Sequence, residues 1–163
     1  RPPALYGPGE HRLVPLFRAA LRGVVPTVHP TGTLSMLSGR DCAEAIARVL
    51  EVEPEARTLF LAEPRTYGRR EMAELVGAAV ERRVRVVPVP VPVLRAAALG
   101  SELGSRLRDA PVAFTRDKVH DLAEPHQCCD PSRAMEELFW GPRDDFGTGA
   151  REMARAYRAK GWL

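Results

Sequence analysis

Residues 58–87, TLFLAEPRTYGRREMAELVGAAVERRVRVV, decide the fold class. The first five of these residues form a short apolar run between polar residues, which is typical of a buried strand. Apolar residues at helical spacing then predict a helix over Tyr67–Arg82, and Val84–Val87 reads as a second strand. This strand–helix–strand alternation indicates an α/β unit.

The same spacing predicts further helices on both sides of this unit. They cover residues 11–22, a segment beginning at Asp41, residues 93–107, a segment beginning at Asp130-Pro131 and residues 147–159. The expected buried stripe of the second is Cys42, Ala45, Ile46, Val49 and Leu50, and that of the last is Ala150, Met153, Ala154 and Tyr157. Residues 24–38 are expected to be a loop with short strands, and the prolines of residues 88–93 to connect rigidly into the next helix.

Length and composition favour one unit over residues 1–163. Its 163 residues are enough to bury a core, and the apolar and charged fractions of 45% and 28% are ordinary for a globular protein. No apolar run approaches the length of a membrane span, so we expect no membrane partner and a cytoplasmic protein. Three cysteines, two of them adjacent, do not form a disulfide framework and fit a reducing compartment.

The charge pattern argues against binding of nucleic acid. The net charge is only +3, and acidic residues are interleaved with the basic ones along the whole chain. Of 24 basic residues only Lys118 and Lys160 are lysine. This excess of arginine has two interpretations, a GC-rich genome or recognition of an anionic ligand.

A cluster of metal-binding residue types lies near the C-terminal helices, but we expect no metal site there. The cluster consists of His120, His126, Cys128, Cys129 and Asp130. The side chains of adjacent cysteines diverge on an extended backbone, and Asp130 is better used as a helix cap. A nucleophilic cysteine paired with His126 would also need an oriented base and an oxyanion hole, and nothing in the sequence supplies them. No catalytic residue is therefore predicted in this chain.

Residues 1–10, RPPALYGPGE, form a rigid loop. Pro2 and Pro3 fix the backbone, and Gly7 and Gly9 around a proline make a tight turn. Local chemistry allows either a simple turn into the next helix or a loop that presents backbone groups to a flat ring. The run resembles the RPxxVYGPG segment of extended short-chain dehydrogenases/reductases, the NAD-dependent epimerase/dehydratase family.

The resemblance continues to the end of the chain. Residues 33–45 and 66–76 are similar to two family segments, and DPSRAMEELF (130–139) with the closing KGWL (160–163) resembles the ending of bacterial members. Ser38, Gly39 and Arg40 replace the usual His-Val-Asp, so we expect Arg40 to make a surface ion pair. Phe139 replaces the usual glycine.

The resemblance implies the C-terminal part of a Rossmann-like fold, with outer strands and helices and a small α-rich substrate-binding lobe. In the family, the residues matching Pro3, Ala4 and Leu5 border the nicotinamide of NAD or NADP. Arg1, Tyr6, Gly7 and Glu10 are the expected contacts to a small-molecule substrate, which the resemblance makes a nucleotide sugar or a steroid- or flavonol-like alcohol.

Two family motifs are missing from these residues. No GxxGxxG follows a strand, and no tyrosine is followed by lysine at the fourth position. We therefore expect the nucleotide-binding half to be absent, cofactor binding to be weak or lacking, and the chain to be inactive alone. The alternative is a non-catalytic module that self-associates or pairs with another chain through exposed strand edges and apolar surface.

Overall fold

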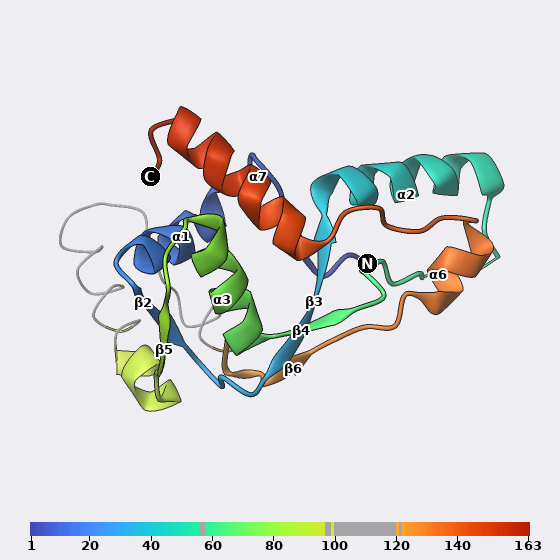
Figure 1. Ribbon diagram of the computed structural model, residues 1–163. Helices are drawn as coiled ribbons and strands as arrows, with labels where there is room; N and C mark the ends of the chain where they lie inside the picture. The colour runs from blue at the N-terminus through green and yellow to red at the C-terminus, as the bar shows by residue number, and fades with distance from the viewer. Residues whose placement is uncertain (56–57, 97–98, 100–119, 121) are drawn as a thin grey trace.

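The computed structural model describes residues 1–55, 58–96, 99, 120 and 122–163 (Figure 1). Its strands are β1 (Ala4–Tyr6), β2 (Val24–Thr27), β3 (Thr33–Ser38), β4 (Thr66–Gly68), β5 (Arg85–Pro88) and β6 (His126–Gln127). Its helices are the 3₁₀ turn η1 (His11–Leu13), α1 (Val14–Leu21), α2 (Gly39–Val52), α3 (Arg69–Ala79), α6 (Ser132–Glu137) and α7 (Phe146–Ala159). Residues 91–96 are also helical, and the rest of the helix predicted over 93–107, apart from residue 99, lies outside the described residues.

Strand β3 organises the larger sheet. Its C-terminal half pairs in parallel with β1, so that Ala4 lies opposite Met36 and Tyr6 opposite Ser38. Its N-terminal half pairs antiparallel with β4 and parallel with β6. A second sheet consists of β2 and β5 in parallel. The described strands therefore form open, mainly parallel sheets, in agreement with the predicted α/β class.

The main core lies where α1, α3 and α7 pack together over the sheets (Figure 1). Phe17 of α1 meets Tyr157 of α7 edge to face, with ring centroids 5.1 Å apart. The predicted stripe of α7 is confirmed, because Ala150, Met153, Ala154 and Tyr157 are all buried. Burial of this stripe holds α7 across α3.

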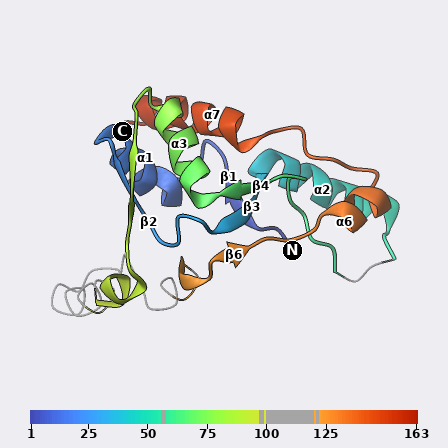
Figure 2. The same ribbon diagram turned by 60° about the horizontal axis from the view of Figure 1, so that its bottom comes forward.

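A second, smaller core joins α2 to α6, on the side of the molecule away from α1 (Figure 2). Leu37 of β3, Ala45 of α2 and Leu138 after α6 are fully buried in it, together with Trp140. Asp130 accepts hydrogen bonds from the backbone nitrogen (2.9 Å) and hydroxyl (2.6 Å) of Ser132. The residue at the cap position of α6 is Pro131, which makes no side-chain cap bond, so the prediction that Asp130 caps a helix beginning at Pro131 is wrong by one residue.

The strand predicted at Thr58–Ala62 is wrong as a ladder strand. The segment belongs to no sheet, although Leu59 and Leu61 are buried as a strand would bury them. Among the described residues its backbone bonds go to Arg1, whose nitrogen donates to Leu59 O (2.6 Å) and whose carbonyl accepts from Leu61 N (3.2 Å).

The prediction for α2 is wrong at its start and along half of its stripe. The helix begins at Gly39, and Ser38 is its cap, because Ser38 Oγ accepts from Asp41 N at 3.0 Å. Cys42 and Ala45 are buried, whereas three predicted core residues are exposed, namely Ile46 (56%), Val49 (38%) and Leu50 (79%). The second core covers only one side of the apolar stripe.

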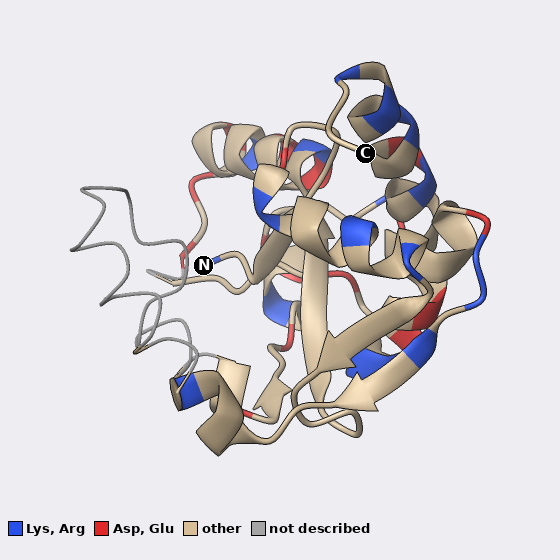
Figure 3. Cartoon of the chain, turned by 90° about the vertical axis from the view of Figure 1, so that its left-hand side faces the viewer, with Lys and Arg blue, Asp and Glu red and all other residues tan. Residues whose placement is uncertain are grey.

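Figure 3 shows basic and acidic residues along the helices and loops of the molecule. The exposed side of α7 carries Arg151, Arg155 and Arg158, while acidic residues lie on neighbouring elements. In the part of the chain that the structure describes, no helix combines the length and apolar character that a membrane crossing requires.

Candidate functional site

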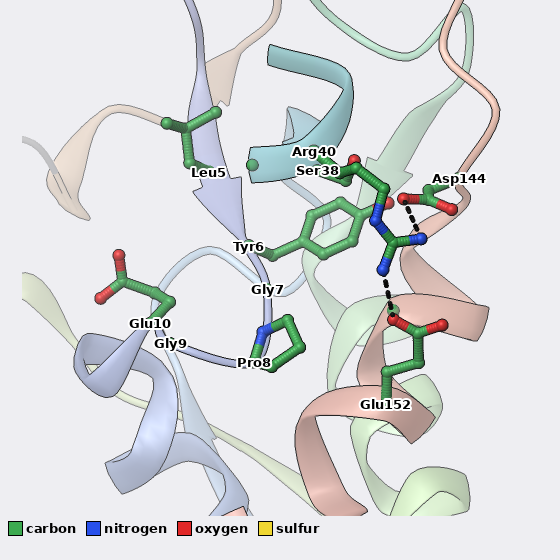
Figure 4. Close-up of a pocket in the computed structure, with 12 residues that line it drawn as sticks. Leu5, Tyr6, Gly7, Pro8, Gly9, Glu10, Ser38, Arg40, Asp144 and Glu152 are labelled. Carbon is green, nitrogen blue, oxygen red and sulfur yellow. Dashed lines mark hydrogen bonds and ion pairs between the residues drawn. The ribbon is translucent and has the colours of Figure 1, made fainter. Parts of the chain in front are cut away.

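The loop after β1 lines a cavity of about 370 Å³. Residues 5–10 form one side, and residues 38–40 with Asp144, Gly149 and Glu152 form the other (Figure 4). The cavity thus lies beyond the carboxyl ends of the parallel strands β1 and β3, which is where ligands bind in open α/β sheets.

Contacts with α7 fix this loop from both ends. The backbone turns at Gly7, whose carbonyl accepts from Glu10 N at 3.0 Å. The Tyr157 hydroxyl donates to the backbone carbonyl of Glu10, and Lys160 Nζ donates to Pro8 O at 3.2 Å. Burial raises the pKa of Tyr157 to about 12, so its hydroxyl keeps the proton that it donates.

Tyr6 packs between the sheet and α7. Its ring meets Phe146 edge to face at 5.3 Å, and a Cβ atom at Gly149 would collide with the same ring. Glycine at this position is therefore what lets the helix approach the loop. Tyr6 is only 2% exposed and forms the floor of the cavity.

A buried carboxyl group lies behind Tyr6. Glu63 accepts a hydrogen bond from the Tyr67 hydroxyl, which itself accepts from Phe146 N at 3.1 Å. The Tyr6 hydroxyl lies close to the same carboxyl but outside hydrogen-bonding geometry. Burial raises the pKa of Glu63, and burial together with this carboxyl raises the pKa of Tyr6 well above its usual range. Tyr6 therefore stays a neutral phenol at physiological pH.

Arg40 lies across the mouth of the cavity (Figure 4). Its guanidinium pairs with Asp144 at 3.6 Å and with Glu152 at 3.3 Å, and its side chain is 67% exposed. The expectation of a surface ion pair for Arg40 is thus confirmed.

The seven predicted site residues separate into three groups. Leu5, Tyr6, Gly7 and Glu10 come together along this cavity. Arg1 is instead bonded through its backbone to the 59–61 segment, and Pro3 directly precedes β1. Ala4 lines a second cavity on the other side of β1.

The second cavity measures about 320 Å³ and lies between β2, β3, α1 and α3. Most of its described lining is apolar, and Arg69 at the start of α3 is its one charged member among those residues. Arg69 was not predicted as a site residue. Helical spacing does indicate that it faces inward, because it precedes Met72 and Ala73 on the buried stripe by three and four residues.

The donors of Arg69 are directed at backbone carbonyls. Nη1 donates to Val28 O (3.2 Å) and Leu122 O (2.9 Å), and Nη2 donates to Glu124 O. Nε is buried and has no acceptor among the described residues. Burial lowers the pKa of this guanidinium. Arg69 thus ties the segment before β6 to the end of β2.

The histidine and cysteine residues near β6 make ordinary polar contacts. Thr33 Oγ1 lies 2.9 Å from His126 Nδ1 and accepts from Cys128 Sγ at 3.3 Å, whereas Cys129 N donates to Ser35 Oγ at 3.1 Å. Among the described residues, no three side chains of metal-binding type gather around a common point.

The fold is shared with solved epimerases and dehydratases. A human epimerase family protein with NADPH matches 95% of this chain at a TM-score of 0.71 and 20% identity. A dTDP-glucose 4,6-dehydratase from Streptomyces venezuelae with NAD and TYD bound matches 100% at a TM-score of 0.66 and 22% identity. The matches take in 47% and 44% of the two solved chains. The chain therefore has a Rossmann-like α/β fold, with parallel strands in open sheets.

One curated protein is similar along the whole of this chain. Ceramide reductase from Caulobacter vibrioides (strain NA1000 / CB15N) is 30% identical over 168 residues, which are 100% of this chain and 51% of that protein. The chain thus spans about half the length of this relative, as it does for the solved structures. No family model matches the chain.

Proposed function

We propose that residues 1–163 form the substrate-binding portion of an NAD(P)-dependent oxidoreductase, epimerase or dehydratase. Its substrate carries a hydroxyl group, as nucleotide sugars and steroid- or flavonol-like alcohols do. One observation carries the proposal: the chain shares the fold of proteins solved with NAD or NADPH while spanning about half of each. The name of the curated relative favours a reductase.

The loop after β1 supplies the contacts in this proposal. Tyr6, Gly7 and Glu10 would face the substrate from one cavity wall. Arg1 is proposed as a further contact, although it precedes β1 and lies outside this lining. Pro3, Ala4 and Leu5 would border the nicotinamide, which supplies the hydride chemistry when bound. Ala4 and Leu5 are exposed on β1, so apolar surface of this strand is available to a flat ring. The described residues offer no phosphate cradle, so the dinucleotide needs further residues to hold it.

The exposed side of α2 supports a partner for this portion. Ile46, Val49 and Leu50 form an apolar strip that the described residues leave uncovered. Phe60, which is 44% exposed, lies within the segment bonded to Arg1, between Leu59 and Leu61. Because the related folds are about twice as long, the partner proposed for this strip is a nucleotide-binding half. A cytoplasmic location is part of the proposal, and it is supported by the three cysteines, which form no disulfide.

The same strip also favours a second candidate, a non-catalytic module that pairs with its own copy. An uncovered apolar strip on a helix is a common protein–protein contact. Sedimentation separates the two. A concentration-dependent dimer that Leu50→Glu disrupts supports self-association, whereas a monomer at high concentration contradicts it.

The main proposal is tested by a chimera. Residues 1–163 replace the matched half of the Caulobacter ceramide reductase. Consumption of NADH and NADPH is measured with carbonyl substrates of each class, formation of NADH and NADPH from NAD and NADP with the corresponding alcohols, and product formation with nucleotide sugars. We expect turnover from the chimera and none from residues 1–163 alone. A folded chimera that binds NADPH but turns over none of these substrates, or turnover by residues 1–163 alone, would contradict the proposal.

A further inference from the structure

We propose that the second cavity, between β2, β3, α1 and α3, takes an uncharged hydrocarbon chain of the substrate and rejects a diphosphate. This inference rests on the proposed function for its link to a substrate, but the cavity and its ligand class can be tested without turnover.

Most of the cavity lining is hydrocarbon, with Thr27, Arg69 and Gln127 as its polar members among the described residues. Leu16 comes from α1, Val25 and Val28 from β2 and the residues after it, Leu34 from β3 and Met72 from α3. Val25 and Val28 are buried and Leu16 and Leu34 are half-buried, so these side chains are held in place while part of their surface stays available. Such a surface favours an apolar ligand, because removing hydrocarbon from water is the main source of binding energy there.

Arg69 is the one charged side chain that the described residues contribute to this lining. A guanidinium binds phosphate best through two parallel N–H groups. In Arg69, Nη1 donates to two carbonyls, Nη2 donates to a third and Nε is buried. Three of its five N–H groups are therefore committed to backbone carbonyls, and Arg69 is poorly placed to balance the charges of a diphosphate.

The position of the cavity connects it with the proposed reaction centre. Ala4 of β1 lines this cavity, and the next two residues of the strand, Leu5 and Tyr6, line the other. Ala4 is also one of the three residues proposed to border the nicotinamide. A hydrocarbon chain in the cavity would therefore bring its functional end to β1, where the hydride chemistry is proposed.

The test is a titration of the full 163-residue chain with primary alcohols of increasing length, and separately with UDP, by calorimetry. Each added CH₂ buried in the cavity should raise affinity about fourfold until the cavity is filled. UDP should give no binding heat. Affinity that does not grow with chain length, or binding of UDP in place of the alcohols, would overturn the proposal.

Two matched variants locate the binding. Leu16→Asp places a charge in the cavity wall and should weaken alcohol binding at least tenfold, while Phe139→Asp introduces the same charge at an apolar side chain that is 80% exposed after α6 and should leave binding unchanged. Leu16→Gln is used if Leu16→Asp does not fold, as judged by thermal melting. Equal affinity in a folded Leu16 variant, or loss of binding in the Phe139 variant, would contradict the assignment of the site.

The outcomes for the cavity and for the proposed function are separable. Chain-length-dependent binding with an inactive, folded chimera would support the cavity and contradict the enzyme proposal. Turnover of a nucleotide sugar by the chimera, with no binding of alcohols, would support the enzyme proposal and contradict the cavity.

Discussion

Helices α2 and α7 both have 14 residues and a clear apolar stripe, yet the protein treats them differently. The stripe of α7 is buried against α1, α3 and the loop after β1. The stripe of α2 is buried only at Cys42 and Ala45, whereas Ile46 and Leu50 are mostly exposed. Periodicity identifies the face of a helix that is suited to burial. It does not tell whether other residues among these 163 pack against that face.

The largest expected effect on stability comes from truncating one large apolar side chain to alanine on each helix. Met153→Ala removes a fully buried side chain from α7 and should lower the free energy of unfolding by about 2–5 kcal/mol. Leu50→Ala on α2 should change it by no more than about 0.5 kcal/mol. Urea unfolding measures both. A similar loss in the two variants would mean that α2 is covered in solution, and the comparison would fail.

The next effect tests the contact between α7 and the site loop. Gly149→Ala places a Cβ against the Tyr6 ring and should cost about 1–3 kcal/mol through overpacking. Gly9→Ala is the control in the same cavity, because a Cβ there meets nothing within 4 Å. Thermal melting of both proteins checks the prediction, and a Gly149→Ala protein as stable as the control would contradict the packing described for Tyr6.

A smaller effect concerns pH and the buried Glu63. Its pKa is raised by burial, so the folded protein holds a proton that the unfolded chain has lost. The contribution of Glu63 to stability should therefore fall as pH rises above the usual value of 4.5 and level off above the raised pKa. Glu63→Gln should remove this part of the pH dependence. Identical pH profiles of unfolding free energy for the two proteins would show that the carboxyl is not buried.

The smallest effect is expected at Arg40. Arg40→Gln breaks two ion pairs with Asp144 and Glu152, but the side chain is 67% exposed, so the loss should be about 0.2–1 kcal/mol. High salt should remove most of this difference by screening. A larger, salt-independent loss would mean that Arg40 is more buried than the exposed ion pair implies.

Local patterns predicted the parts of the fold that depend on neighbours in sequence. The bounds and stripe of α7 followed from spacing, and the loop from Leu5 to Glu10 followed from its prolines and glycines. The strand at 58–62 was wrong because a ladder depends on a partner from elsewhere in the fold, which a local pattern does not contain; among the described residues, the backbone of this segment bonds to Arg1. Ser38 and Asp41 are both good caps, and sequence cannot choose between them.

The candidate site was only partly predictable for a similar reason. Tyr6 and Glu10 were found because they lie on a recognisable loop. Arg69 and Glu63 were missed because charged residues are ordinarily exposed, and their burial depends on contacts from distant segments, such as the carbonyls of Leu122 and Glu124. For Arg69, however, helical periodicity does indicate an inward position on the apolar stripe of α3.

Calorimetric titration of residues 1–163 with NADH and NADPH tests the central claim most directly. The claim is that this chain supplies the substrate side of a site whose cofactor is held mainly by other residues. It predicts no stoichiometric binding of either cofactor to the chain alone, and tight binding once the nucleotide-binding half is joined to it. Tight one-to-one binding by the 163 residues alone would contradict it.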